Sequence, residues 1–254
     1  MLKRTILLFI ATILLVQGSV FASNTSKIKK DPAPLKIGIS PEYPPFEFIK
    51  DGKLQGFSVD LGEALAKELS RKAEFIEMNF SGLIAALQSR KIDLIISSLS
   101  ITENRKKIVS FSMPYYVSKL SLVVLRGSEV KTMSDLKNKV VGVQLGSTME
   151  QFVKPIAQND NIRVISMDSN LVLVQELKKK IINGIVIEES QAKVFVKANK
   201  DLEYYDVPTE SYPSLGYAIA LRQGCCFGDE IDAALSKFKK NGLSASLEKK
   251  WLGE

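Results

Sequence analysis

Histidine is absent from the 254-residue chain, and cysteine and tryptophan are scarce, at two residues and one residue. Without histidine, neither a Ser–His–Asp nor a Cys–His catalytic arrangement can form, and zinc loses a preferred ligand. Glycine loops that cradle phosphates or dinucleotides are also missing. Acid–base chemistry by carboxylates stays open, but no spacing of the acids singles out a pair. We therefore expect no metal and no cofactor, and the residues favour a binding protein over an enzyme.

The two cysteines, Cys225 and Cys226, are adjacent in the sequence. Adjacent cysteines can bridge only through a strained ring, so an ordinary structural disulfide is not expected. A pair of free thiols and a strained vicinal bridge both stay open as interpretations.

Basic clusters that alternate with aromatic residues, as in a nucleic-acid groove, are missing as well. The formal net charge is +7, and the densest basic run is "KKK" at 178–180. This pattern indicates a solvated, lysine-rich surface and no nucleic-acid partner. With 45% apolar and 25% charged residues, the chain has the balance of a globular protein. Its length suits one large domain or two smaller lobes.

Residues 1–22 have the layout of a secretory signal peptide. Lys3 and Arg4 form a basic start, an apolar stretch runs from 6 to 16, and residues 20–22 fit a cleavage site. The apolar stretch is shorter than the roughly 20 residues of a membrane span, so an uncleaved anchor is the less favoured alternative. No cysteine follows the expected cut before Cys225, so we expect a soluble periplasmic protein without a lipid anchor.

Strand and helix patterns alternate after a polar, flexible lead-in at 23–34. Strands are predicted at 35–39, 74–78, 92–97, 120–125, 139–144, 163–166, 184–187 and 217–221. Helices are predicted at 59–70, 82–90, from about 149, at 170–180, 191–198 and 229–241, with a linker at 209–216. The prolines of "PEYPPFEF" predict an irregular loop. The alternation predicts an α/β fold of two units, whose ligands bind beyond the carboxyl ends of strands.

The stretch "SSLSITENR" occupies one such strand end. The hydroxyls of Ser97, Ser98, Ser100 and Thr102 and the guanidinium of Arg105 form a strong set of donors for a carboxylate. Thr102 is expected to cap a short helix whose first turn contains Arg105. A cation there opposes the helix dipole unless an anion binds beside it. The alternative is a capped helix with an exposed arginine.

Other candidate residues lie at further strand ends. Thr148, in "LGST", lies where a helix begins, so N–H groups there can bind an anion; the alternative is a plain turn. Tyr43 and Phe80 can face a ligand side chain or a guanidinium, or they can pack in the core. Glu188 can accept an ammonium group, or it is a solvated acid beside Glu189.

These residues stand in the motifs "YPPFEF", "GFSVDL", "GLIAALQSRKIDLIISSLSITENR", "FSMPYY", "GVQLGST" and "KKWL". In combination the motifs resemble the periplasmic amino-acid-binding proteins of ABC importers, which are solute-binding proteins of family 3. The resemblance runs from about residue 35 to 251. It is closest to the receptors for arginine and to those for lysine, arginine and ornithine.

The resemblance implies a two-lobed, type II periplasmic-binding-protein fold. Each lobe would be a mostly parallel sheet flanked by helices, and two hinge strands would join the lobes. Lobe 1 would comprise 35–116 and 216–254, lobe 2 would comprise 121–208, and the hinge segments would be 117–120 and 209–215.

The resemblance also implies which residues bind the charged ends of a free L-amino acid. Arg105 would grip the α-carboxylate, helped by the backbone N–H groups of Ser98 and Thr148. The α-ammonium group would be taken by the carbonyl of Ser97, the hydroxyl of Ser100 and the carboxylate of Glu188. Many relatives carry aspartate in place of this glutamate.

Further roles concern the ligand side chain, which Tyr43 and Phe80 would sandwich, while Thr102 would support the binding loop. Ser40 stands where receptors for basic amino acids often carry an acid. A cationic side chain would then need Glu47, another acid or water. Met149 aligns with a residue that is often polar.

The implied function is an extracytoplasmic receptor, expected to be a monomer, that closes over a free L-amino acid and delivers it to an inner-membrane permease. Arginine or another basic amino acid is the leading ligand, and glutamine or another polar amino acid is the alternative. An enzyme like cyclohexadienyl dehydratase, with Glu47 as its acid, and the sensing domain of a signalling protein are alternatives from other classes. The absence of a membrane span after the signal peptide argues against the sensor.

Overall fold

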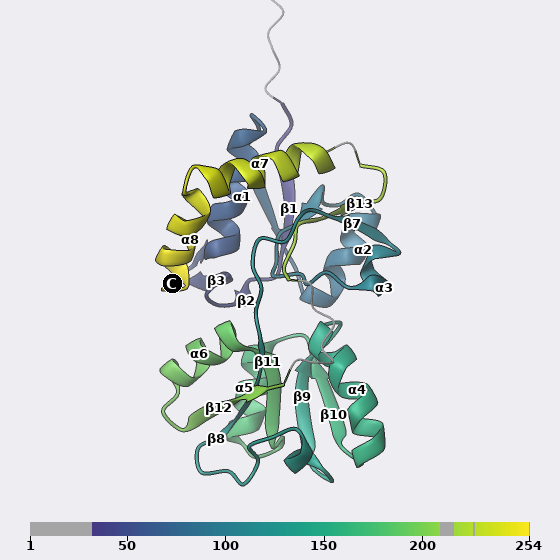
Figure 1. Ribbon diagram of the computed structural model, residues 1–254, viewed down its shortest axis with the longest axis vertical. Helices are drawn as coiled ribbons and strands as arrows, with labels where there is room; N and C mark the ends of the chain where they lie inside the picture. The colour runs from purple at the N-terminus through teal and green to yellow at the C-terminus, as the bar shows by residue number, and fades with distance from the viewer. Residues whose placement is uncertain (1–31, 209–215, 226, 254) are drawn as a thin grey trace, which may run out of the picture. The chain divides into compact units, whose positions relative to one another are not determined.

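The computed structural model describes residues 32–208, 216–225 and 227–253. The predictions for the signal peptide at 1–22, for most of the lead-in, for the segment 209–215 and for Cys226 lie outside the described residues. The described residues form two five-stranded sheets and one three-stranded sheet (Figure 1). No helix among them combines the length and apolar content that a membrane crossing requires.

The first sheet has the strand order β5-β1-β6-β13-β7. These strands are Ala73–Glu77, Leu35–Ile39, Leu94–Ile95, Ala220–Arg222 and Val109–Phe111. Strand β1 pairs in parallel with β5 and β6, and β13 runs antiparallel to β6 and β7. The carboxyl ends of β1 and β6 therefore meet at one edge, which places Ser40 beside the loop that begins at Ser97.

Helices cover both faces of the first sheet. One apolar cluster joins it to α1 (Phe57–Glu68), α7 (Gly228–Lys240) and α8 (Leu243–Trp251). A second cluster joins it to α2 (Leu83–Gln88), which follows the short 3-10 helix Phe80–Gly82. The predicted apolar face of α7 is buried, because Ile231, Leu235 and Phe238 recur at helical spacing.

The second sheet has the strand order β10-β9-β11-β8-β12. These strands are Arg163–Met167, Val140–Gln144, Gly184–Glu188, Leu120–Leu125 and Leu202–Val207. The strands β10, β9 and β11 are parallel, whereas β8 runs antiparallel to β11 and β12. The predicted strand at 184–187 is one residue longer than expected, so Glu188 is its last residue.

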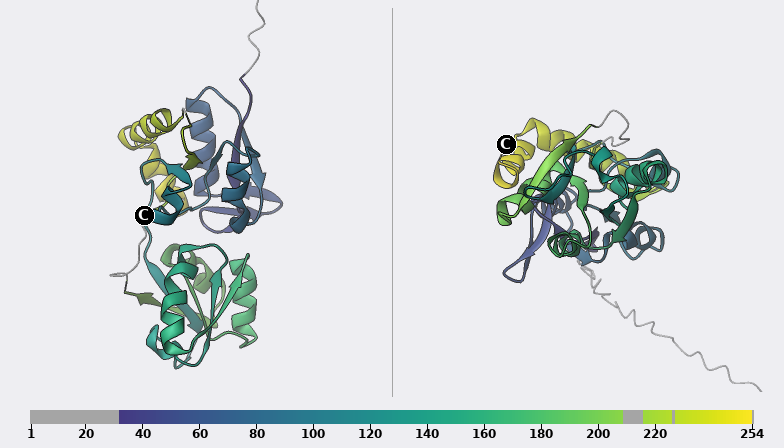
Figure 2. Two further views of the ribbon diagram at one scale, coloured as in Figure 1. Left: turned by 90° about the vertical axis from the view of Figure 1, so that its right-hand side faces the viewer. Right: turned by 90° about the horizontal axis from the view of Figure 1, so that it is seen from below.

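Helices also cover both faces of the second sheet, as the turned views show (Figure 2). One cluster contains α4 (Thr148–Asp160) and the short 3-10 helix Ser134–Leu136, and the other contains α5 (Asn170–Lys178) and α6 (Glu189–Ala198). The chain passes from the first sheet to the second through residues 112–119. Tyr116 in this passage forms an antiparallel bridge with Tyr217.

The prediction of an irregular loop for "PEYPPFEF" is wrong. Residues Glu42–Tyr43 (β2) and Glu47–Lys50 (β3) form an antiparallel pair, and Lys53–Gln55 (β4) extends it to a three-stranded sheet. The prolines do not prevent this pairing because Pro44 and Pro45 lie in the turn between β2 and β3. The hairpin register places Tyr43 opposite Glu47.

Besides β2, β3 and β4, two further strands were not predicted, because their sequences show no clear alternation. These are β7, which contains the hydroxyl of Ser110, and β12, whose "LEYYDV" carries two acids. Trp251, predicted to serve packing or docking, packs against the first apolar cluster, and its indole N–H donates to the Asp60 carboxylate at 2.7 Å.

Candidate functional site

The ends of strands from both sheets line one small cavity. Its lining side chains come from the loops after β1 and β6, the β2–β3 hairpin, the segment before α2, and the carboxyl ends of β9 and β11. These residues are Ser40, Tyr43, Glu47, Phe80, Ser97, Ser98, Gln144, Met149 and Glu188. Of these, only Gln144 was not a sequence candidate. We refer to this space as the strand-end cavity.

The loop after β6 is held by hydrogen bonds within and beneath it. The backbone N–H of Ser40 donates to Ser97 Oγ at 2.9 Å. Ser98 adopts the left-handed region with φ 46, a conformation that costs free energy for a residue other than glycine. Contacts with the surrounding residues must stabilise this backbone conformation. One of them is the hydrogen bond that Ser98 Oγ donates to Glu47 Oε2 at 3.2 Å.

Thr102 caps the short helix α3 (Glu103–Lys106), as predicted, because its Oγ1 accepts from the backbone N–H of Arg105 at 3.2 Å. The exposed-arginine alternative is wrong, since Arg105 is only 4% exposed. Its guanidinium donates to the Ser100 carbonyl at 2.7 Å and to the Gly146 carbonyl at 2.9 Å. The ring of Phe80 lies 5.6 Å from the guanidinium carbon. The guanidinium thus joins the loop of the first sheet to the β9–α4 turn.

Glu188 is 2% exposed, so the alternative of a solvated acid is also wrong. The phenol hydroxyls of Tyr43 and Tyr217 both donate to Glu188 Oε2, and Ser100 Oγ lies 3.5 Å from Oε1. Burial raises the pKa of this carboxyl to about 7, although the two phenols and the Arg105 charge favour its ionised form. Glu188 is therefore close to the balance between its two protonation states at neutral pH.

Tyr217 is a functional candidate that sequence reasoning missed. Its side chain is fully buried, and burial together with the neighbouring Glu188 charge raises its pKa well above the ordinary value. The sequence pattern predicts Tyr217 as the first residue of a strand at 217–221, whereas β13 begins at Ala220, so the strand pattern gave no sign of a role for this residue in the site. Its position beside Glu188 comes from long-range pairing with Ser100 and Tyr116.

Glu47 is the second buried carboxyl of the strand-end cavity, at 1% exposed. Its oxygens lie 3.4 Å from Ser97 Oγ and 3.2 Å from Ser98 Oγ. Burial raises its pKa to about 8, and the hydroxyls of Ser58, Ser97 and Ser98 only partly oppose this shift. Glu47 is therefore mostly protonated at pH 7.

Thr148 and Met149 follow the β9–α4 turn as the first two residues of α4, and both are buried. Met149 lines the strand-end cavity, whereas Thr148 is not among its lining residues. The cap of α4 is Ser147, whose Oγ accepts from the Glu150 backbone N–H at 3.1 Å. Gly146 has φ 74, which suits a residue without a side chain, and its N–H donates to Glu150 Oε2 at 2.7 Å. One N–H of this turn is thus committed to a carboxylate of the protein itself.

The predicted site residues therefore converge, with differences in their placement. Ser100 and Arg105 do not line the strand-end cavity, but each contacts a residue that does. Ser100 Oγ lies 3.5 Å from Glu188 Oε1, and the Arg105 guanidinium lies beside the Phe80 ring. Thr102 caps α3, as predicted, while its support of the binding loop stays a prediction. Phe80 lies both on the cavity wall and beside the Arg105 guanidinium.

Two other hydrogen bonds connect the elements of the two sheets near this cavity. Ser81 Oγ donates to Asp168 Oδ1 at 2.5 Å, and Gln191 Nε2 donates to the Glu42 carbonyl at 3.2 Å. The cavity itself measures about 10 Å³, which is room for about one water. A larger ligand therefore requires these elements to separate or the side chains to move.

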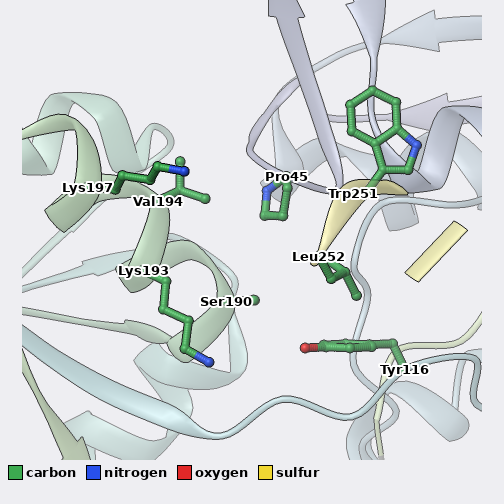
Figure 3. Close-up of a pocket in the computed structure, with 8 residues that line it drawn as sticks. All are labelled: Pro45, Tyr116, Ser190, Lys193, Val194, Lys197, Trp251 and Leu252. Carbon is green, nitrogen blue, oxygen red and sulfur yellow. The ribbon is translucent and has the colours of Figure 1, made fainter. Parts of the chain in front are cut away.

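A second, larger cavity of about 240 Å³ lies nearby. Figure 3 shows Pro45, Tyr116, Trp251 and Leu252 on one side and the α6 residues Ser190, Lys193, Val194 and Lys197 on the other. None of the predicted binding residues lines it, and its lining carries lysines without a carboxylate. It is a poorer match than the strand-end cavity for a ligand that carries both charges.

Opposite charges close together define the chemistry of the strand-end cavity. A buried guanidinium can bind an anion, and a buried carboxylate beside it can bind an ammonium group. No group of three or more potential metal ligands occurs in the part of the chain that the structure describes. The arrangement is suited to a small zwitterion.

Known proteins show the same architecture. The chain matches "Bacterial extracellular solute-binding proteins, family 3" over residues 35–254. It is 33% identical over 250 residues to the "Arginine-binding extracellular protein ArtP" of Bacillus subtilis, and the match covers 98% of each protein.

Two solved structures extend this comparison. "An ancestral arginine-binding protein bound to arginine" has a TM-score of 0.82 and 38% identity, covering 87% of this chain and 99% of that one. "An ancestral arginine-binding protein bound to glutamine" has a TM-score of 0.81 and 40% identity, covering 87% of this chain and 98% of that one. The predicted α/β, type II binding-protein fold is confirmed. The chain belongs to the bacterial extracellular solute-binding proteins of family 3.

Proposed function

We propose that the protein is an extracytoplasmic receptor that binds a free L-amino acid and delivers it to an ABC permease. The observation that carries this proposal is the pairing of Arg105 and Glu188, two buried and oppositely charged side chains beside one cavity. An α-amino acid is the smallest common solute that carries both complementary charges. Relatives named as arginine-binding proteins support the same class of ligand.

Arg105 and Glu188 each bind one charged end of the amino acid. Arg105 takes the α-carboxylate, with the backbone N–H groups of Ser98 and Thr148 as further donors. The α-ammonium group goes to Glu188, the Ser97 carbonyl and Ser100. Both phenols, those of Tyr43 and Tyr217, donate to Oε2 of Glu188, so Oε1, which Ser100 Oγ approaches at 3.5 Å, is the oxygen that accepts the ammonium group.

Binding is coupled to closure of two lobes, with lobe 1 at 35–116 and 216–254 and lobe 2 at 121–208. Residues 117–120 and 209–215 serve as the hinge. The small size of the strand-end cavity supports an opening step before the ligand enters. The contacts of Arg105 with Gly146 and of Ser81 with Asp168 then mark the surfaces that meet on closure.

Arginine or another basic amino acid is the leading ligand. Tyr43 and Phe80 offer aromatic faces to a long side chain, and Glu47 is the acid that remains for its cation. Glutamine or another polar amino acid is a second candidate, because the small Ser40 adds no charge and a related protein has been solved with glutamine.

We further propose that the ligand leaves unchanged. The matched relatives are named as binding proteins, which supports this view. The enzyme alternative requires Glu47 to act as an acid on prephenate or arogenate. Recovery of unaltered arginine, and no turnover of those two compounds, is the expected result; turnover would contradict the receptor.

The layout of residues 1–22 supports a cleaved signal peptide and a periplasmic receptor without a lipid anchor, which works as a monomer with an inner-membrane permease. Mass measurement of the exported protein tests the cleavage. A mature N-terminus near residue 23 is expected, and a full-length mass would contradict it.

A thermal-shift screen of the mature protein against the standard amino acids tests the function. Stabilisation follows RT ln(1 + [L]/Kd), so the tightest ligand gives the largest shift. Arginine, or else another basic amino acid, should give that shift. The receptor proposal is contradicted if no amino acid stabilises the protein.

A further inference from the structure

The strand-end cavity contains one carboxyl group more than a zwitterion with a neutral side chain can use. Two carboxyls, Glu47 and Glu188, line this cavity, and the lining contains no lysine or arginine. Arg105 adjoins the cavity through its contact with Phe80, and its positive charge acts on Glu188. Once a zwitterion has used Arg105 and Glu188, Glu47 has no opposite charge from the ligand backbone.

The groups that surround Glu47 offer it hydroxyls and no cation. Ser97 and Ser98 come from the loop after β6, and Ser58 comes from α1. The titratable groups around it are Glu188 from β11, Tyr115 from the passage after β7, and, beyond Glu188, the phenols of Tyr43 and Tyr217 and the guanidinium of Arg105. The largest influences on the Glu47 pKa are burial, three serine hydroxyls and the Glu188 charge, and none of these is a cation.

We propose that a cationic ligand side chain binds with the loss of one proton from Glu47, whereas a neutral side chain of the same length leaves that proton in place. The proposal rests on the amino-acid-binding function proposed above. It extends that function because it makes Glu47 the residue that selects for side-chain charge. A protonated Glu47 is a hydrogen-bond donor to a neutral side chain, and an ionised Glu47 is the counter-ion of a guanidinium.

The sign of the pH effect follows from the protonation states. Burial raises the pKa of Glu47 to about 8 in the structure without ligand, so below pH 8 the protonated form dominates. A cation then has to compete with the proton, and its affinity falls as the pH falls. The Glu188 carboxyl imposes a similar competition on every α-ammonium group, so it cancels when two amino acids are compared.

Arginine and citrulline are the matched probes, because citrulline replaces the guanidinium by a neutral urea group on the same chain. Calorimetric titration of the mature protein with each probe at pH 6, 7 and 8 gives the ratio of the citrulline Kd to the arginine Kd. We expect this ratio to rise about tenfold from pH 6 to pH 7 and less from pH 7 to pH 8. Buffers of different ionisation enthalpy at pH 7 should show about one more proton released by arginine.

The variant Glu47→Gln should make the ratio independent of pH, while Glu63→Gln, an exposed change on α1, should leave the wild-type slope. A constant ratio in the wild-type protein overturns the inference, and this result needs no variant to fold. If neither probe binds and no other amino acid does, the receptor function itself fails instead.

Discussion

The two buried glutamates of the strand-end cavity are similar in burial but differ in their neighbours. Glu188 ends a strand of the second sheet and receives two phenol hydroxyls, with the Arg105 charge nearby. Glu47 lies in the hairpin beside the first sheet and is surrounded by serine hydroxyls. Their pKa values, about 7 and about 8, follow this difference. Burial is nearly the same for both carboxyls, so their partners make the difference. Two phenols and the Arg105 charge favour the ionised form of Glu188, which suits an ammonium ligand, whereas Glu47 has serine hydroxyls and retains its proton.

Among the changes considered, removal of the Arg105 guanidinium should cause the largest loss of amino-acid affinity. Arg105→Gln removes the charged donor to the ligand carboxylate and makes the surroundings of Glu188 more like those of Glu47. We expect amino-acid affinity to fall by a factor of about 100 or more, corresponding to about 3 kcal/mol, since a buried carboxylate loses its charged partner. Calorimetry measures the loss.

The matched control for this change is Lys106→Gln, which alters the next residue of the same helix, where the side chain pairs at the surface with Glu103. Its affinity should stay close to that of the wild type. Equal losses from both variants, or none from Arg105→Gln, would show that the guanidinium does not hold the ligand.

Removal of the Tyr217 hydroxyl tests whether a phenol, a hydrogen-bond partner that Glu47 lacks among the described residues, stabilises the ionised form of Glu188. Tyr217→Phe deletes a hydrogen bond to Glu188, and bonds to charged groups contribute about 1.5–3 kcal/mol. The free energy of unfolding should therefore drop by about 2 kcal/mol at pH 8, where Glu188 is ionised, and by less at pH 5. Urea denaturation at both pH values measures this, with Tyr205→Phe on β12 as the control. A loss independent of pH would contradict the role of the phenol as a partner of the carboxylate.

The sequence predicted the local features of the site and the fold, but not the long-range contacts. The cap by Thr102, the strand end at Glu188 and the apolar face of α7 are local patterns, so periodicity and residue type predicted them. The strand pairing of Tyr43 with Glu47 and the approach of Tyr217 to Glu188 depend on long-range contacts. No local signal distinguishes such contacts from loops or ordinary packing.

The burial of Arg105 was likewise undetermined from sequence, because an arginine after a helix cap is usually exposed. Its burial results from carbonyls at Ser100 and Gly146, and the second of these belongs to the other sheet. The cavity residue Gln144 was missed for a related reason, since the strand pattern of β9 accounted for it without any role in binding.

The stability of the unliganded protein should fall as the pH rises from 5 to 8. Both buried carboxyls have a pKa above the ordinary 4.5, so the folded state holds more protons than the unfolded state in this range. The stabilisation is complete below pH 4.5 and is lost as the pH rises through about 7 for Glu188 and about 8 for Glu47. Each acid should contribute a slope of up to about 1.4 kcal/mol per pH unit.

Urea denaturation between pH 5 and 8 measures this slope. Glu47→Gln should reduce it by about half and shift its end from about 8 towards about 7, the value for Glu188. Glu63→Gln on the exposed face of α1 should leave it unchanged. A profile that rises with pH would contradict the pKa shifts of both carboxyls.

The smallest expected effect concerns the ring beside the cation. Phe80→Leu removes a cation–π contact with Arg105, whose guanidinium carbon lies 5.6 Å from the ring. A loss of about 0.5–2 kcal/mol in amino-acid binding is expected, because such contacts are stronger when they are buried. Arginine and alanine should be compared: similar losses indicate support of Arg105, and a larger loss for arginine indicates contact with the ligand side chain.

A crystal structure of the mature protein with bound arginine tests the central claim most directly. The α-carboxylate should lie within hydrogen-bonding distance of the Arg105 guanidinium, and the α-ammonium group should contact the Glu188 carboxylate. Arginine found in the larger cavity of Figure 3, with no contact to Arg105 or Glu188, would contradict the claim.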